Sequence, residues 1–328
     1  MAKKTWTERA LAMINRLKLK SSSLVVLMLA GLGLGRCESG PAPLDRATYE
    51  ELYTDPVAVP PGPQRVFHIG HSLVGRDMPA MLAQLAGPGH GYESQLGWGA
   101  TLKSHWEPDV PVNGFETENA HLRYRDARKA TASGEYNAII LTEMVEIKDA
   151  IKYFASADYL HRFARSAWEA NPETRIYLYE TWHNLNDPDG WMTRLSRDLR
   201  DYWEGEILKR ALAYDGMIHP IYLIPAGQVM ERLVDEVEAT GGAPGLTSRQ
   251  DLFSDEIHLT DQGHYLIALV HYAVLYQRDP TGLPHTLLRA DGTPAQAPDP
   301  AAATLMQRVV WDVVQDMPIT GVPRRAPS

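Results

Sequence analysis

Three side chains in two distant segments of the chain could together form a nucleophilic site. Ser72 lies in the segment HIGHSL, where a short apolar run ends in a turn that contains glycine. Asp255 and His258 lie three residues apart in the segment FSDEIHLTDQGHY. A carboxylate can hold an imidazole in one tautomer, and that imidazole can remove the proton of a serine hydroxyl. The residue types therefore predict acyl transfer through Ser72, His258 and Asp255.

Each of these residues also has an interpretation that involves no chemistry. Serine is a common helix cap, and Ser72 comes shortly before an expected helix. Asp255 could cap a turn and His258 could be an ordinary loop residue, because an isolated D-x-x-H pattern is weak evidence. The catalytic interpretation depends on the two segments occurring together.

Taken together, the two segments resemble the SGNH (GDSL-like) hydrolase family over residues 65–278. The segment GHSL stands where the family often has GDSL or GNSL. The last block, D-x-x-H-L-T-x-x-G, is complete in this chain, with Asp255, His258, Leu259, Thr260 and Gly263. The resemblance implies a three-layer α/β/α domain with a five-stranded, parallel, flavodoxin-like sheet. It also implies a Ser72–His258–Asp255 triad that cleaves ester bonds without a cofactor.

The family's middle blocks supply donors to the oxyanion that forms during acyl transfer. The resemblance implies that the backbone N–H groups of Ser72 and of a glycine in GWGAT contribute. Gly99 is the expected glycine, with Gly97 as the alternative. Glycine suits this role because its backbone can approach a substrate closely and can adopt a positive φ.

The asparagine that the family places after the third strand is missing from this chain. The corresponding segment, ILTEMVEIKD, offers Glu143 and Glu146. A carboxylate cannot donate to an oxyanion unless it is protonated. We therefore expect Asn184, which follows the fourth expected strand, to act as the substitute donor.

Strands and helices must alternate along the chain to bring these residues together. Apolar runs bounded by glycine or by charged residues predict buried strands within residues 65–70, 92–97, 136–143, 175–182 and 221–227. Helical spacing of apolar residues predicts helices within residues 78–86, 156–170, 191–214, 261–277 and 301–314. This alternation is typical of a parallel sheet covered on both faces. A serine after the first strand then lies at the edge where such sheets bind ligands.

The beginning of the chain has a different composition from the rest. Residues 1–36 carry seven of the 32 Lys and Arg residues and one of the 41 Asp and Glu residues. The apolar run 24–34 is shorter than the about 20 residues that a membrane span needs. These features predict a signal or lipoprotein-like leader over residues 1–37, and hence an exported protein that is periplasmic, secreted or lipid-anchored at the cell envelope. An uncleaved amphipathic anchor is the alternative.

The single cysteine, Cys37, directly follows this leader in the segment LGRC. Bacterial lipoprotein signals have a leucine three residues before a lipidated cysteine, which makes Cys37 a tentative lipidation site. Arg36 stands where such signals usually have a small residue, so a free cysteine in a flexible segment is the alternative. One cysteine excludes an internal disulfide and a cysteine-based zinc site.

The remaining boundaries follow from composition. Six prolines between residues 41 and 63 predict a Pro-rich, extended linker over residues 38–63. The hydrolase domain is expected over residues 64–316 and a flexible tail over residues 317–328. The net charge of -9 argues against a nucleic-acid binder with a broad basic face.

The sequence thus predicts an exported serine hydrolase that cleaves an acyl or acetyl ester on a carbohydrate or another small molecule. Trp98, Trp106 and Trp182 follow expected strands and could stack on a sugar, or could simply pack. No metal site is expected, because no helical H-x-x-x-H pair with a third ligand occurs. One alternative is an O-acyltransferase that uses the same site. The other is an inactive carbohydrate-binding protein of the same fold, since a fold alone does not determine function.

Overall fold

The computed structural model describes residues 40–217 and 219–325 of the chain. The predicted leader over residues 1–37, including Cys37, lies outside the described residues. In the part of the chain that is described, no helix is long and apolar enough to cross a lipid bilayer.

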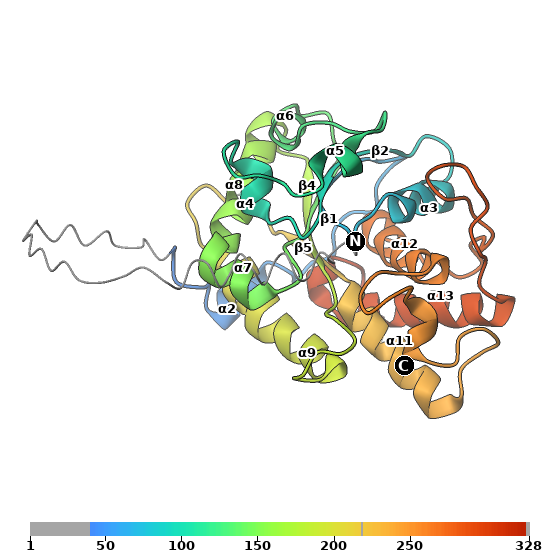
Figure 1. Cartoon of the computed structure of the whole chain (residues 1–328). Coiled ribbons are helices and arrows are strands. Elements are labelled where there is room, and N and C mark those ends of the chain that lie inside the picture. Colours follow the sequence, from blue (N-terminus) through green and yellow to red (C-terminus); the bar gives the residue numbers. More distant parts are fainter. Residues whose placement is uncertain (1–39, 218, 326–328) are drawn as a thin grey trace, which may run out of the picture. The chain divides into compact units, whose positions relative to one another are not determined.

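Five parallel strands form one sheet in the order β2-β1-β3-β4-β5 (Figure 1). The strands are β1 (Arg65–His71), β2 (Gly91–Gly97), β3 (Ala138–Leu141), β4 (Arg175–Glu180) and β5 (Tyr222–Pro225). All four neighbouring pairs run parallel, so the strands end at one common edge. The predicted α/β class, with a flavodoxin-like five-stranded sheet in three layers, is confirmed.

Alternate residues of the strands pack into two separate hydrophobic clusters, one on each face of the sheet. In β3, Ala138 and Ile140 belong to one cluster, and Ile139 and Leu141 belong to the other. This alternation follows from the two-residue period of a strand. It explains why the strands appear in the sequence as continuous apolar runs, since both faces are buried.

Helices cover both faces of the sheet (Figure 1). One face packs against α3 (Asp77–Ala86), α11 (Ala226–Thr240), α12 (Asp261–Tyr276) and α13 (Pro300–Asp316). The other face packs against α2 (Arg46–Glu51), α4 (Leu102–Trp106), α6 (Ala127–Thr131), α7 (Ile147–Phe154) and α8 (Ser156–Ala170). Shorter elements are α5 (Phe115–Asn119) and the 3₁₀ turns η2 (Arg249–Leu252) and η3 (Pro318–Thr320).

Two helical regions differ in detail from the prediction. The helix expected over residues 191–214 begins as α9 (Trp191–Asp198), continues with π-type hydrogen bonds over η1 (Leu199–Leu208), and ends as α10 (Lys209–Ala211). Helix α11 was not predicted, and its first residues were assigned to the fifth strand. Its buried side chains Val229, Met230, Leu233, Val234 and Val237 have the helical spacing that would have indicated it.

The linker predicted over residues 38–63 needs correction at residues 46–53, which include a short helix and pack on the core. Asp45 caps α2 by accepting from the Thr48 N–H. Tyr49 and Tyr53 are buried against the core, and the Tyr53 hydroxyl donates to the Ile221 carbonyl at 2.7 Å. The prolines flank a packed helix, so their number alone misled the prediction.

The flexible tail predicted over residues 317–328 also needs correction. Residues 318–320 form the turn η3, and Ile319 and Val322 are buried. The packed part of the domain therefore extends past residue 316. Residues 326–328 lie outside the described residues.

Candidate active site

Ser72 lies directly after β1, at the carboxyl edge of the central strands. β1 ends at His71, and the chain then turns through Ser72 and Gly75 into α3. Gly70 permits this close packing, because a Cβ atom there would lie 2.4 Å from the Thr142 side chain of the β3 loop. The turn therefore holds a half-buried serine hydroxyl at the ligand edge of the sheet.

The loop that carries His258 is fixed by its backbone and by the start of α12. The Ser254 N–H donates to the His258 carbonyl at 2.8 Å, which closes the loop. Thr260 caps α12 through its side chain, which accepts from the Gly263 N–H. Gly263 has no room for a side chain, because a Cβ atom would lie 2.4 Å from the Leu252 carbonyl oxygen. The D-x-x-H-L-T-x-x-G pattern thus corresponds to a tight loop followed by a capped helix.

Asp255 holds the imidazole of His258 in one orientation. Its Oδ1 accepts from the backbone N–H groups of Ile257 at 2.8 Å and His258 at 2.7 Å. Its Oδ2 lies 2.7 Å from His258 Nδ1. These bonds, with the backbone N–H of His258 contributing most, lower the pKa of the Asp255 carboxyl to about 2.

Ser72 and His258 meet although they are 186 residues apart in the chain. Ser72 Oγ lies 3.0 Å from His258 Nε2. An ionised carboxylate only accepts hydrogen bonds, so His258 Nδ1 carries the ring hydrogen toward Asp255. Nε2 of the neutral ring is then left to accept the Ser72 proton. The arrangement can therefore activate the hydroxyl as a nucleophile.

Ser72 and His258 face an open cavity. Ser72 and His258 line a cavity of about 670 Å³ together with residues of β2, α3 and the loops 121–123 and 289–291. The side chains of His258 and Asp255 are 45% and 53% exposed. A substrate in this cavity could reach the Ser72 hydroxyl directly.

Gly99 occupies a position suited to a backbone donor. The register pairs His71 of β1 with Gly97 of β2, so Ser72 and Gly99 follow the ends of neighbouring strands. Gly99 has φ +56° and open space where a Cβ atom would be. A Cβ atom on Gly97 would lie 2.1 Å from the Val112 side chain, so Gly97 is closely packed. The geometry favours Gly99 over Gly97 as the exposed glycine.

Asn184 is engaged away from the serine turn. Its Nδ2 donates to Glu256 Oε2 at 3.3 Å, and its Oδ1 accepts from the Asn186 N–H at 2.9 Å. The amide that the oxyanion role requires thus has another partner, and its contacts do not include the Ser72 turn. The expected role of Asn184 as a third donor gains no support from this arrangement.

Glu143, which follows β3, is fully buried and holds the neighbouring loop. Its Oε1 accepts from the N–H groups of Met144 at 2.8 Å and Leu102 at 3.3 Å, the latter at the start of α4. Burial raises the pKa of the Glu143 carboxyl to about 7. Because α4 begins three residues after Gly99, Glu143 ties the loop of Gly99 to the loop of β3. Its buried side chain is a positioning group rather than a surface for substrate.

His71 and Glu146 also have structural partners. The Leu73 N–H donates to His71 Nδ1 at 3.3 Å, so Nε2 carries the hydrogen and donates to the Glu143 carbonyl at 2.8 Å. Burial lowers the pKa of the His71 imidazole to about 4, which keeps this ring neutral. The Glu146 carboxylate lies 3.4 Å from the Arg194 guanidinium.

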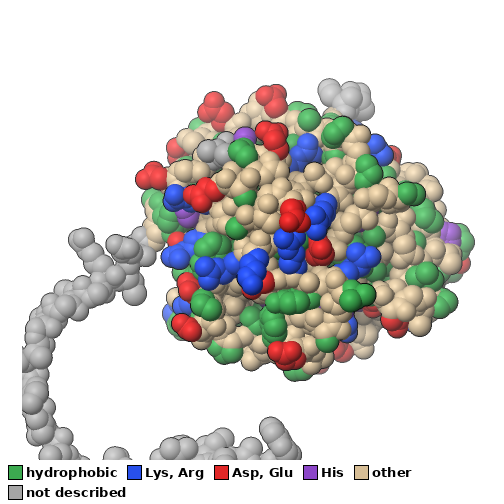
Figure 2. Space-filling view, turned by 90° about the horizontal axis from the view of Figure 1, so that it is seen from above, with side chains coloured by type: hydrophobic (Ala, Val, Ile, Leu, Met, Phe, Trp, Pro, Cys, Tyr) green, Lys and Arg blue, Asp and Glu red, His purple; other side chains and the backbone are tan. Residues whose placement is uncertain are grey.

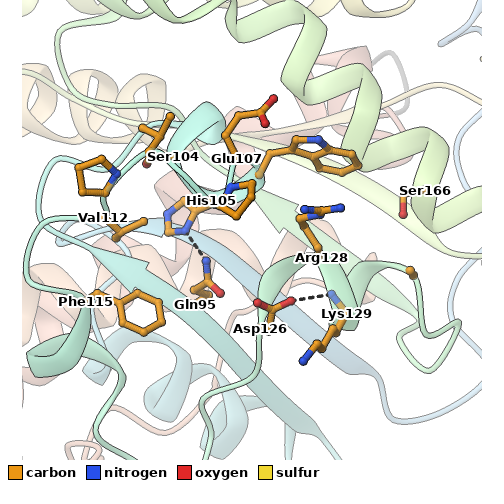
Figure 3. A pocket seen from close by; sticks show the side chains of 15 residues that line it. Gln95, Ser104, His105, Glu107, Val112, Phe115, Asp126, Arg128, Lys129 and Ser166 are labelled. Carbon is orange, nitrogen blue, oxygen red and sulfur yellow. Dashed lines mark hydrogen bonds between the residues drawn. The ribbon is translucent and has the colours of Figure 1, made fainter.

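A second cavity, of about 760 Å³, lies over α4 and α6 and lacks the serine, histidine and carboxylate arrangement (Figure 3). His105 lines it, but its Nδ1 faces the Gln95 amide at 2.9 Å and its Nε2 the Gly70 carbonyl at 2.9 Å. Arg128 and Lys129 of α6 also line it. Figure 2 shows Lys and Arg side chains gathered on the face that is uppermost in Figure 1. Both ring nitrogens of His105 are thus engaged away from the serines that line this cavity.

Two arginines beside Ser72 were not among the residues singled out from the sequence. Arg76 and Arg123 line the same cavity as Ser72. Arg76 could have been noticed because it lies four residues after the serine. No sequence signal marks Arg123, which reaches the cavity only through the path of the loop between α5 and α6. Among residues 40–217 and 219–325, no three His, Cys, Asp or Glu side chains are grouped to hold a metal ion.

Comparisons with known proteins show likeness at the level of the fold. No family model and no curated relative matches the chain. A solved DUF4886 family protein from Bacteroides uniformis has a TM-score of 0.51 and 17% identity, and the match covers 76% of this chain and 94% of that one. A Streptococcus pneumonia protein, named provisionally as a platelet activating factor, has a TM-score of 0.39 and 18% identity, with 70% and 90% covered. A gut microbial diltiazem-metabolizing enzyme has a TM-score of 0.34 and 11% identity, with 67% and 48% covered. The chain is thus similar to the first of these in its α/β/α fold.

Proposed function

We propose that this chain is a serine hydrolase of the SGNH type that cleaves an ester bond. The observation that carries the proposal is the pair of contacts on His258: 3.0 Å from Nε2 to Ser72 Oγ and 2.7 Å from Nδ1 to Asp255 Oδ2. One fold can host many unrelated functions. The proposal therefore rests on these contacts and not on the similarity of the fold to solved structures.

In the proposed first step, Ser72 Oγ attacks the ester carbonyl and His258 Nε2 takes the hydroxyl proton. The N–H groups of Ser72 and Gly99 are the proposed donors to the oxyanion. When the intermediate collapses, the bond to the alcohol oxygen breaks and His258 returns the proton to that oxygen. An acyl group is then bound to Ser72 Oγ and the alcohol leaves.

In the proposed second step, a water molecule takes the place of the alcohol, and His258 again takes and then returns a proton. His258 Nε2 takes a proton from water as the water oxygen attacks the acyl carbonyl. The acyl–Oγ bond breaks, the proton returns to Ser72 Oγ, and the free acid leaves. Asp255 orients His258 and stabilises its cationic form throughout.

We also propose that the acyl group is attached to a carbohydrate and that the protein is exported. Trp98 supports the first point, because it lies one residue from Gly99 and its side chain is half exposed. Its indole N–H donates to Glu118 at 2.7 Å, which holds the ring in place. The basic, then apolar, leader supports export. N-terminal sequencing of cell fractions tests it, and an intact Met1 chain would argue against cleavage.

Hydrolysis of p-nitrophenyl acetate tests the proposed reaction. We expect turnover by the wild-type chain and a loss of at least about a thousandfold in Ser72→Ala, because triad members act as a unit. Ser196→Ala is a matched control, since this serine is exposed on α9 and does not line the cavity of Ser72. Equal activity of Ser72→Ala and the wild type would refute the proposal. Product analysis with a sugar acceptor would separate hydrolysis from acyl transfer.

A further inference from the structure

The cavity in front of Ser72 is lined by three arginines from three separate segments, Arg76, Arg123 and Arg289. Only Arg289 is neutralised by an ion pair. Its guanidinium bonds Asp261 through two nitrogens, at 2.9 Å and 2.6 Å. Within the described residues, Arg76 and Arg123 have no carboxylate partner.

Arg123 is held in a defined place by groups that carry no charge. Its Nη1 donates to the Tyr92 carbonyl at 3.1 Å, and its guanidinium lies over the Tyr92 ring, 4.0 Å from the centroid. The Arg123 carbonyl accepts from the N–H of Ser94, in the middle of β2, at 3.0 Å. The remaining guanidinium donors of Arg123 are therefore free for a ligand, and the side chain is already ordered.

His121 adds a third polar group on the same side of the cavity. Its Nδ1 accepts from the Arg123 N–H at 3.2 Å, while its Nε2 is buried without a partner among the described residues. Burial lowers the pKa of His121, and the positive charges of Arg76 and Arg123 lower it further. A hydrogen bond with the Glu118 backbone and the Glu118 carboxylate oppose this effect, and that carboxylate also accepts from the Trp98 indole N–H.

The acidic groups of the cavity are tied to the backbone. Asp77 Oδ1 accepts from the Ala290 N–H at 2.8 Å. Asp291 Oδ1 accepts from the N–H and the hydroxyl of Thr293 at 2.8 Å and 2.6 Å. These contacts fix the loop 289–293, and in the described part of the chain neither carboxylate forms an ion pair with Arg76 or Arg123.

We propose that the ester substrate carries, apart from the reacting ester, a negatively charged group such as a carboxylate. In this proposal Arg76 and Arg123 bind the charged group beside Ser72. This inference rests on the proposed hydrolase function and names its substrate class. Guanidinium groups bind carboxylates through paired hydrogen bonds, which places the ester as well as attracting it. The N–H form of His121 Nε2 supplies a further donor to the same group.

Two pairs of rigid esters test this inference, because the charge can lie on either side of the ester bond. The first pair is 4-acetoxybenzoate, with its charge on the alcohol side, and the neutral 4-acetoxybenzamide. The second pair is the mono-4-nitrophenyl ester of terephthalic acid, with its charge on the acyl side, and the neutral 4-nitrophenyl ester of terephthalic acid monoamide. In each pair the ratio of kcat/KM for the charged ester to that for the neutral ester is compared between variants, so that intrinsic reactivity cancels.

We expect Arg76→Gln and Arg123→Gln each to lower this ratio by roughly tenfold in one of the two pairs, as for a lost charge-assisted contact. Hydrolysis of the neutral ester should stay within about twofold of wild type. Arg76→Lys and Arg123→Lys should restore part of the ratio. Arg232→Gln, an exposed arginine on α11, is the control and should leave it unchanged.

The inference is overturned if the arginine variants leave the ratio unchanged in both pairs while Ser72-dependent hydrolysis of the neutral ester persists. Failure of the hydrolase proposal looks different, because then no ester is cleaved in a Ser72-dependent way. Calorimetric binding of the four esters to Ser72→Ala needs no turnover and gives a second readout. Binding of a charged ester that weakens in Ser72→Ala/Arg123→Gln supports the inference, and equal binding of charged and neutral esters refutes it.

Discussion

The two halves of the sheet's carboxyl edge use polar residues in opposite ways. After β1, Ser72 faces an open cavity and bonds His258, whose other ring nitrogen bonds Asp255. Glu143 after β3 and Glu180 at the end of β4 are fully buried, and they accept from backbone N–H groups at the starts of α4 and α11. Burial keeps the pKa of these two carboxyls high, at about 7 and about 8. The first half is thus arranged for reaction with a ligand and the second for holding loops.

A buried ion-pair network lies in the second half. Arg194 of α9 bonds Asp198 at 2.9 Å and Asp187 at 2.5 Å, and Asp198 also lies 3.3 Å from His183 after β4. The Arg194 and Asp198 side chains are 3% and 0% exposed. Comparison of the two halves predicts that substitutions after β1 change turnover, whereas substitutions after β3 and β4 change stability.

Asp255→Asn should cause the largest loss among the supporting residues. An asparagine keeps the size of the side chain but can present its amide to His258 Nδ1, which favours the wrong tautomer. We expect kcat to fall by about 10²–10⁴-fold with a small change in KM. Because the pKa of Asp255 is about 2, the loss should be constant across the neutral pH range. A loss of less than tenfold in steady-state kinetics would contradict the assigned role.

Arg194→Met should mainly destabilise the protein. The substitution removes the guanidinium that pairs with the buried carboxylate of Asp198. Breaking a buried ion pair costs about 3–5 kcal/mol. Urea denaturation measures the free energy of unfolding, with Arg232→Met as an exposed control on α11. Residual folded enzyme should keep most of its kcat. If the variant kept wild-type stability but lost much of its kcat, this half of the sheet edge would take part in the reaction, and the comparison would be wrong.

Glu143→Gln should remove a pH dependence of stability. The pKa of Glu143 in the folded chain is about 7, above its ordinary value of 4.5, so the folded state binds more protons between these values. The free energy of unfolding therefore falls as the pH rises through this window. The Gln carbonyl can still accept from Leu102 and Met144.

We accordingly expect Glu143→Gln to gain stability relative to wild type between pH 4.5 and pH 8, by on the order of 1–3 kcal/mol. Denaturation at both pH values measures this gain, and kcat should change little. Parallel stability profiles of wild type and variant would show that Glu143 does not titrate in this range.

Asn184→Ala should have the smallest effect. Its amide bonds Glu256 in an exposed loop, so we expect less than a threefold change in kcat and little change in stability. Removal of a true oxyanion donor typically lowers kcat by about 10²–10³-fold. Steady-state kinetics distinguish these outcomes, and a hundredfold loss would restore Asn184 as the third donor.

The sequence predicted those parts of the molecule that depend on local pattern. Continuous apolar runs indicated the buried strands, and the spacing of Asp255, His258 and Thr260 reflects one loop and its helix cap. The number of prolines did not indicate the packed helix at residues 46–51, where Tyr49 is buried, or the burial of Tyr53. The surroundings of the serine were harder to predict, since contacts of Arg123 depend on the path of a loop distant in sequence.

The family pattern was informative where it matched and uninformative where it did not. The missing asparagine led to Asn184 by its place after a strand, but place along a strand edge does not determine which partner a side chain meets. Glu143 stands near the expected position, and only its burial and its bonds to two backbone N–H groups reveal what it does. Buried polar groups of this kind leave no periodic signal in a sequence.

Covalent labelling tests the central claim most directly, that His258 and Asp255 make Ser72 a nucleophile. A fluorophosphonate reacts when a serine Oγ–P bond forms and fluoride leaves. We expect mass-spectrometric mapping to find one adduct, on Ser72, with labelling slowed at least a hundredfold in His258→Ala. An unlabelled Ser72, or an adduct on another residue that forms equally fast in both proteins, would contradict the account.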